Sequence, residues 1–263
     1  MPARLEEILS STRRCLPDLH GRRDALERAI QSSHVARPSF RSALRKTTVA
    51  VIAEVKRRSP SAGPIREDLD PGDRAALYAA HGAAAISVLT DGPYFGGSVQ
   101  DLRDAASRCP LPVLRKDFIL DEVQVLEARA AGASAVLLIV RALGQPRLSL
   151  LLRYAHDLSL DALVEVHSAE ELRLALDSGA EIIGVNSRDL DTFEIDVAAA
   201  WKLLGRVPND RVAVAESGIL GQSDVLSAAT AGADAVLIGT ALSRAESPGA
   251  LLRTLASIPR SGR

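Results

Sequence analysis

The chain has 263 residues, of which 47% are hydrophobic, and a formal net charge of −1. This length predicts one large α/β domain or two small ones, and either could bury a substantial core. The near-neutral charge argues against nucleic acid or an anionic membrane as the main partner, because such partners need a basic surface.

The two cysteines, Cys15 and Cys109, lie far apart and in no metal-ligand spacing. They indicate neither a disulfide framework nor a zinc site, and they suit a reducing compartment. The first residues carry too many charges for a signal peptide, and no uninterrupted apolar run reaches membrane-spanning length. We therefore expect a cytoplasmic protein that binds no metal and has neither a membrane nor a nucleic-acid partner.

Residues 1–47 precede the first predicted strand. Two segments in this part, LEEILSS and RDALERAI, place apolar side chains at helical spacing, namely Leu5, Ile8, Leu9, Leu26 and Ile30. We expect residues 1–47 to form an N-terminal helical extension. It would cap a single catalytic domain over residues 48–258.

The first predicted strand, TTVAVIAEVK over residues 47–56, ends in two charged residues. Glu54 and Lys56 lie two apart, so their side chains point to the same face of the strand. Strands of a parallel sheet are usually apolar on both faces, because helices cover them. The pair is either a structural ion pair or an acid–base pair. The residues at the ends of the other predicted strands indicate which of the two it is.

Four segments further along the chain repeat one pattern, a Gly-Ala pair followed by a short apolar run. Their glycines are spaced 50, 47 and 53 residues apart, at Gly82, Gly132, Gly179 and Gly232. Glycine fits the left-handed position just after a helix end. The apolar run then indicates a buried strand.

Strand and helix patterns alternate eight times along the chain. Three further strand candidates, LPVLRKDF, LDALVEVH and DRVAVAES, lie between the repeats, and amphipathic stretches such as DEVQVLEARAA fill the gaps. This alternation predicts a parallel sheet, and eight units in about 250 residues predict a closed α/β (βα)8 TIM barrel. An open doubly wound sheet is the alternative, weakened by the missing Gly-rich dinucleotide turn after the first strand.

The ionisable residues at the predicted strand ends come from odd-numbered strands, which share the same layers of a barrel interior. They are Glu54, Lys56, Lys116, Glu165 and Glu216. The even-numbered strands contribute Leu137, Asn186 and Gly239.

Such a layer is either a buried ion-pair network that fills the barrel mouth or a site of chemistry. Desolvation makes buried ion-pair networks poor stabilisers, which favours chemistry. Two lysines with carboxylates indicate stepwise proton transfer on a carbonyl or imine. Schiff-base formation by a lysine stays open as an alternative.

Two loops predict a phosphate site. Ser217 and Gly218 follow the seventh strand, and Gly239 and Thr240 follow the eighth. Barrels bind phosphate in these loops through backbone N–H groups and hydroxyls. A phosphorylated small molecule is therefore the expected ligand.

Aromatic residues are scarce, at 3% of the chain, yet three follow the second and third strands. They are Tyr94, Phe95 and Phe118. Beside Leu137 and Leu190, they could line an apolar wall for a flat ring of the substrate, although Phe118 could equally belong to the core.

Seven stretches together resemble the indole-3-glycerol-phosphate synthase family: IAEVKRRSPSAG, SVLTDGPYFGGS, PVLRKDFILDEVQV, LVEVH, IGVNSRDLDTFEID, VAESGI and LIGTAL. They occur in the family's order and cover about residues 51–242. The resemblance implies a lyase of tryptophan biosynthesis that acts on 1-(2-carboxyphenylamino)-1-deoxyribulose 5-phosphate. This substrate is closed, decarboxylated and dehydrated to indole-3-glycerol phosphate without cofactor or metal.

The resemblance also implies roles for the strand-end residues. Lys116 would protonate the ketone oxygen, and loss of water would follow with Lys56 as acid and Glu165 as base, although these two could exchange parts. Glu54 and Asn186 would hold the sugar hydroxyls and the lysines, and the carboxylate of Glu54 would favour the protonated form of Lys56. Substrate contacts are implied for Ser59, Phe118, Leu137, Arg188, Leu190 and Glu216, and phosphate contacts for Ser217, Gly218, Gly239 and Thr240.

Two positions depart from the family's pattern. Ala62 stands where a lysine is common, which removes a positive charge from the loop after the first strand. Ser243 stands where methionine is common, and we expect it to be a packing position. Two other functions stay open: a flavin-binding barrel oxidoreductase, and a barrel that binds a sugar phosphate without catalysis. We expect a monomer or a weak homo-oligomer.

Overall fold

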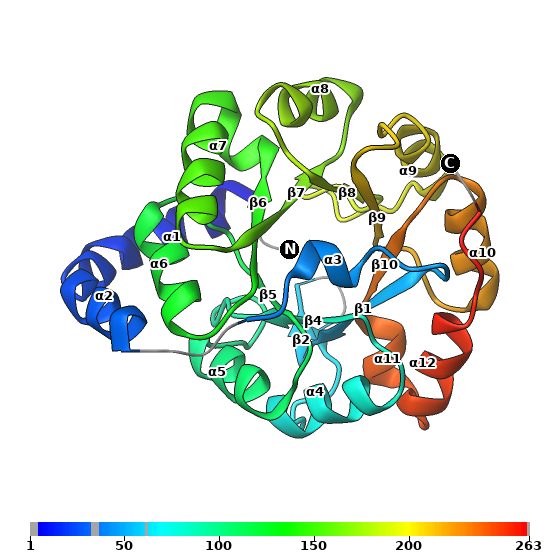
Figure 1. The fold of residues 1–263 in the computed structure, drawn as a ribbon, viewed down its shortest axis with the longest axis horizontal. Coiled ribbons are helices and arrows are strands. Elements are labelled where there is room, and N and C mark those ends of the chain that lie inside the picture. The colour runs from blue at the N-terminus through cyan, green and yellow to red at the C-terminus, as the bar shows by residue number, and fades with distance from the viewer. Residues whose placement is uncertain (1–4, 33–36, 61–62, 262–263) are drawn as a thin grey trace.

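Eight parallel strands close into a barrel in the computed structural model, which describes residues 5–32, 37–60 and 63–261 (Figure 1). The strand order around the barrel is β1-β10-β9-β8-β7-β6-β5-β4, and β4 pairs back with β1. The barrel strands are β1 (Ala50–Val55), β4 (Ala85–Leu89), β5 (Val113–Lys116), β6 (Ala135–Ile139), β7 (Asp161–Val166), β8 (Ile182–Asn186), β9 (Val212–Glu216) and β10 (Ala235–Ile238). The predicted TIM barrel is confirmed, and the open sheet was the wrong alternative.

Helices follow the strands and form the outer layer. They are α4 (Pro71–Ala80), α5 (Val99–Arg108), α6 (Glu122–Ala130), α7 (Val140–Asp157), α8 (Ala169–Asp177), α9 (Val197–Leu204), α10 (Gln222–Thr230), and the pair α11 (Thr240–Arg244) and α12 (Pro248–Ala256). After β1, two short strands that were not predicted pair antiparallel: β2 (Arg58–Ser59) and β3 (Gly63–Pro64). Among the described residues, no helix is both long and apolar enough to cross a membrane.

The repeated glycines occupy the predicted left-handed positions. The φ angles of Gly82, Gly132, Gly179 and Gly232 are 98°, 91°, 85° and 102°. Each glycine lies between a helix end and a barrel strand. An L side chain is strained at such φ values, so the repeat marks the helix-to-strand turns of the barrel.

Three helices precede the barrel: α1 (Leu5–His20), α2 (Arg23–Ser32) and α3 (Phe40–Ala43). The helix α3 lies across the barrel opening in Figure 1 and closes the end at which the strands begin. Phe40 and Leu44 are fully buried there, and the backbone N–H of Arg41 donates to the Asp161 carboxylate at 2.9 Å, at the start of β7.

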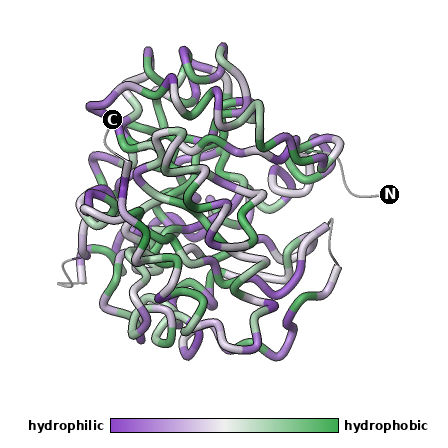
Figure 2. Tube along the Cα trace, turned by 90° about the vertical axis from the view of Figure 1, so that its right-hand side faces the viewer, coloured by the Kyte–Doolittle hydropathy of each residue, from purple (hydrophilic) through white to green (hydrophobic). Residues whose placement is uncertain are grey.

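The helix α1 lies at the opposite end of the barrel. Its residues Leu5, Ile8 and Leu9 are buried in the same apolar cluster as Phe118, which follows β5. Figure 2 shows the barrel from the side, with the N and C labels on opposite sides of it. The helix α2 packs against α6 on the outside. The N-terminal helices therefore cover both ends of the barrel rather than one.

The core has two layers. One fills the space between the strands and the outer helices, and the other fills the barrel itself with side chains such as Ile52, Leu114, Leu163 and Val214. Because strand residues alternate between the two layers, the residues two positions beyond Ile52, Leu163 and Val214 also point inward. Those residues are Glu54, Glu165 and Glu216.

Candidate active site

A cavity of about 590 Å³ opens at the carboxyl ends of the barrel strands. This volume lies within the range of small-molecule sites in proteins. The residues predicted as catalytic, substrate-binding or phosphate-binding line it: Glu54, Lys56, Ser59, Lys116, Phe118, Leu137, Glu165, Asn186, Arg188, Leu190, Glu216, Ser217, Gly218, Gly239 and Thr240. The closed barrel thus brings residues as far apart in the sequence as Glu54 and Thr240 into one chamber.

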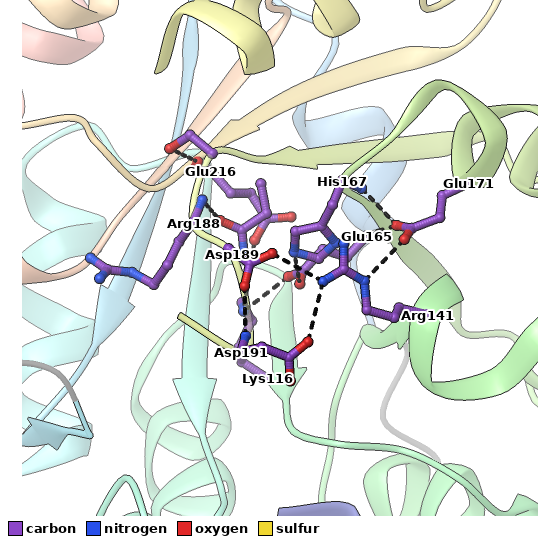
Figure 3. Close-up of polar contacts among 11 residues, drawn as sticks. Lys116, Arg141, Glu165, His167, Glu171, Arg188, Asp189, Asp191 and Glu216 are labelled. Atoms are coloured by element: carbon purple, nitrogen blue, oxygen red, sulfur yellow. Dashed lines mark hydrogen bonds and ion pairs between the residues drawn. The ribbon is translucent and has the colours of Figure 1, made fainter. Parts of the chain in front are cut away.

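Lys116, at the end of β5, lies between two carboxylates. Its Nζ is 3.4 Å from Glu165 Oε2 and 3.7 Å from Glu216 Oε2, and both glutamate side chains are almost completely buried (Figure 3). Burial alone would lower the pKa of Lys116, but Glu165, Glu216 and then Glu54 outweigh it and raise the pKa. The amine is therefore held as a cation at neutral pH.

The two carboxyls beside Lys116 differ in their affinity for a proton. For Glu165, burial raises the pKa, but Lys116 and His167 outweigh it and the pKa is lowered. For Glu216, burial and the neighbouring Glu165 carboxylate raise the pKa well above the ordinary value. When two carboxyls share one site, one of them keeps its proton. Glu165 is therefore the more acidic member of the pair, and Glu216 the one that holds a proton more tightly.

Lys56 follows β1 and lies beside Glu54, with 3.6 Å between Lys56 Nζ and Glu54 Oε1. The two side chains share a face, as predicted. Burial lowers the pKa of Lys56 more than Glu54 raises it, and the positive charges of Lys116 and Arg188 lower it further. Glu54 favours the protonated form of Lys56, as predicted, but desolvation outweighs this effect. The result is a more acidic lysine.

Two glycines leave room for the buried glutamates. A Cβ added to Gly184 of β8 would collide with Glu216 Oε1, and one added to Gly239 would collide with Glu54 Oε1. The sequence analysis assigned Gly239 to the phosphate loop alone, and the structure gives it this second function. Glycine lets the carboxylates lie against the strand backbone.

The loops after β9 and β10 meet at one side of the cavity. Ser217 and Gly218 both have left-handed φ angles, 64° and 70°, and Thr240 begins α11. The first N–H groups of a helix have no partner within that helix. Ser243 is fully buried, as expected of a packing position, and its hydroxyl also donates to the carbonyl oxygen of Lys56 at 3.1 Å.

The apolar wall forms as predicted in part. Phe95 and Phe118 lie with their ring centroids 6.2 Å apart, and both line the cavity with Leu137 and Leu190. Tyr94 instead ties the neighbouring loop to α1, since its hydroxyl donates to the carbonyl oxygen of Glu7 at 3.4 Å.

Several lining residues were missed by the sequence analysis. Leu5 and Ile8 of α1 reach the cavity, and Arg244 at the end of α11 lines it as well. Asp91 accepts hydrogen bonds from the backbone N–H groups of Tyr94 and Phe95, so it shapes the loop that carries Phe95. The motif DGPYF contains this signal, because Asp before a turn often accepts such bonds.

Ala62 lies outside the described residues. Within the described ranges, no group of three or more His, Cys, Asp or Glu side chains is placed to hold a metal ion.

The fold and the side chains gathered at the barrel mouth define a (βα)8-barrel enzyme. A family model described as indole-3-glycerol phosphate synthase matches residues 5–255. The chain belongs to this family, and it is an enzyme of the carboxy-lyase class, with the family's place in tryptophan biosynthesis.

Individual relatives agree with the family model. The chain is 48% identical over 240 residues to indole-3-glycerol phosphate synthase 2 of Streptomyces coelicolor, covering 89% of this chain and 93% of the relative. It is 53% identical over 205 residues to indole-3-glycerol phosphate synthase of Desulfosudis oleivorans, covering 78% of each. A solved structure of 3-hexulose-6-phosphate synthase from Salmonella typhimurium has a TM-score of 0.61 at 14% identity, covering 79% of this chain and 97% of that one. That last likeness shows the fold alone.

Proposed function

We propose that this enzyme converts 1-(2-carboxyphenylamino)-1-deoxyribulose 5-phosphate to indole-3-glycerol phosphate by lysine and glutamate acid–base catalysis. The observation that carries the mechanism is the position of Lys116, whose Nζ lies within 4 Å of both Glu165 and Glu216 in the cavity that Lys56 also lines. Family membership supplies the reaction, and the geometry supports the roles below.

Ring closure comes first and forms a carbon–carbon bond. The ring carbon that bears the carboxylate attacks the ketone carbon of the sugar chain, and the ketone oxygen becomes negatively charged. Lys116 donates a proton to that oxygen. Its raised pKa is no obstacle, because a developing alkoxide is more basic than an amine, and a positioned cation stabilises the charge as it forms.

Decarboxylation and loss of water follow. The bond to the carboxylate breaks, carbon dioxide leaves, and the electron pair returns to the ring. The new hydroxyl then leaves as water with a proton from Lys56, whose lowered pKa makes it the stronger acid of the two lysines. Glu165, ionised at neutral pH, takes the proton released as the five-membered ring becomes aromatic.

The remaining lining residues orient the two ends of the substrate. Ser217, Gly218, Gly239 and Thr240 would receive the phosphate through hydroxyls and backbone N–H groups. Phe118, Leu137 and Leu190 would hold the aromatic ring, and Glu54, Ser59, Asn186 and Arg188 would contact the sugar chain and the substrate carboxylate. In this assignment residues 48–258 form the catalytic domain and residues 1–47 its helical extension.

Indole fluorescence on mixing enzyme and substrate, with no metal or cofactor added, tests the proposal. We expect Lys116→Met to lower kcat by about 10²–10⁴-fold. Lys202→Met, which removes an exposed lysine on α9, is the matched control and should keep wild-type turnover. Near-normal turnover in Lys116→Met would contradict the assigned role. A flavin absorbance band in the purified protein would favour the oxidoreductase alternative.

A further inference from the structure

The two carboxylate oxygens of Glu165 contact different residues. Oε2 lies 3.4 Å from Lys116 Nζ, and Oε1 lies 3.5 Å from the ring nitrogen Nε2 of His167 (Figure 3). His167 is the first residue after β7, and its side chain is only 5% exposed. The sequence analysis assigned no role to this histidine.

The other side of the His167 ring meets a second carboxylate. Nδ1 lies 3.3 Å from Glu171 Oε2, and the backbone N–H of His167 donates to that same oxygen at 2.7 Å. Glu171 Oε1 accepts from Arg141 Nε at 3.1 Å, and Arg141 Nη1 donates to Asp189 Oδ2 at 3.2 Å. A continuous chain of contacts therefore runs from Glu165 to the loop after β8, as Figure 3 shows.

The contact between His167 and Glu165 joins two buried atoms. In the part of the chain that the structure describes, neither Glu165 Oε1 nor His167 Nε2 makes a hydrogen bond. Buried polar atoms without a partner are uncommon and need an explanation. Hydrogen bonds at catalytic groups are often long without substrate and tighten when it binds, so a 3.5 Å contact fits a pair that closes during the reaction.

We propose that His167 is a positioning residue, which orients the Glu165 carboxylate beside Lys116 and connects it through Glu171 and Arg141 to the loop after β8. The inference rests on the proposed function, in which Glu165 acts as the base. The same loop carries Arg188 and Leu190, which line the cavity. Contact of substrate with this loop is thereby linked to the orientation of Glu165.

The charges around the ring agree with this role. Glu165 of β7 and Glu171 of α8 face the two ring nitrogens, with Lys116 beyond the first carboxylate and Arg141 of α7 beyond the second. Each ring nitrogen faces one of the two carboxylates, so the ring lies directly between Glu165 and Glu171. His167 is also one of the causes that outweigh burial and lower the pKa of Glu165.

Two amide substitutions separate the two contacts of the ring. In His167→Gln the amide nitrogen takes the place of Nε2 and keeps a donor towards Glu165. In His167→Asn it takes the place of Nδ1 and keeps only the donor towards Glu171. We expect His167→Asn to lower kcat by about 10- to 100-fold with KM nearly unchanged, and His167→Gln to retain most of the wild-type kcat.

The pH dependence of kcat is the readout that a merely structural role would not move. Both amides remove the ring that helps to lower the pKa of Glu165, so this pKa rises and the acid limb of the profile shifts to higher pH. Equal kcat values in the two variants, or an acid limb at the wild-type position, would overturn the proposal. Glu165→Gln is measured in the same assay. Near-normal turnover in Glu165→Gln would contradict the proposed function itself. Loss of turnover in Glu165→Gln, together with wild-type turnover in both His167 variants, would contradict only the positioning role.

Glu171→Gln provides a second route if the His167 variants do not fold. It neutralises the outer carboxylate with an isosteric side chain and leaves the ring in place. We expect a loss of kcat of up to about tenfold, with unchanged KM and melting temperature. A wild-type kcat in a folded Glu171→Gln protein would overturn the proposed connection.

Discussion

Two lysines beside glutamates face one cavity, and their surroundings shift their pKa values in opposite directions. Lys56 has one carboxylate, 3.6 Å away, and burial outweighs it, so the pKa falls. Lys116 has two within 3.7 Å, from Glu165 and Glu216, and with Glu54 they outweigh burial and raise the pKa. The acidity of a lysine in this barrel therefore depends on how many neighbouring strands direct a carboxylate towards it.

The largest expected effect on kcat comes from removing the Glu165 carboxylate, which is ionised and lies beside Lys116. Glu165→Gln eliminates the proposed base and the closest partner of Lys116, and should lower kcat by about 10²–10⁴-fold. Single-turnover fluorescence with excess enzyme measures this loss apart from substrate binding. A variant with more than a tenth of wild-type kcat would show that another group takes the proton.

Glu216→Gln sharpens the comparison within the same pair. Because the pKa of Glu216 is raised and that of Glu165 is lowered, a neutral amide of similar shape changes the charge at Glu216 less than at Glu165. We expect a loss of kcat of less than about tenfold, well below that of Glu165→Gln. The two variants are measured side by side at pH 7, and equal losses would contradict the division of charge between the two carboxyls.

On the Lys56 side, the comparison predicts a change in pH dependence. Lys56 must be protonated to donate, so kcat falls as the pH rises through its lowered pKa. Glu54 favours the charged form, and Glu54→Gln should therefore lower this pKa further and shift the basic limb of the kcat profile to lower pH. Lys202→Met is again the control. A basic limb that moves to higher pH would have the wrong sign for this assignment.

The sequence allowed the barrel and its site to be predicted because both depend on local patterns. Alternation of strand and helix patterns predicts the closed sheet, and the odd-numbered strands of such a barrel share the same interior layers. That rule places Glu54, Glu165 and Glu216 in one chamber. Neither pattern requires knowledge of distances.

The missed features depend on three-dimensional contact between distant segments. Glu54 favours the charged form of Lys56, as predicted, but the extent of burial that outweighs it arises only in the closed barrel. Likewise, Leu5 of α1 reaches the cavity because the N-terminal helix folds back over the barrel mouth. His167 follows Glu165 by two residues, but its contact with Glu171 depends on how α8 begins.

The smallest expected effect concerns the backbone that carries Lys56. The hydroxyl of Ser243 donates to the Lys56 carbonyl oxygen in a fully buried position. Ser243→Ala leaves that carbonyl without this donor and should lower the free energy of unfolding by about 0.5–1.5 kcal/mol, as measured by urea denaturation. Ser227→Ala, which removes an exposed hydroxyl bonded within α10, is the matched control and should lower the free energy of unfolding less.

Because the lowered pKa of Lys56 arises from burial and charge rather than from this hydrogen bond, the basic limb of the kcat profile should stay in place in Ser243→Ala. A shift comparable to that of Glu54→Gln would mean that the backbone position of Lys56, and not its carboxylate partner alone, controls its acidity.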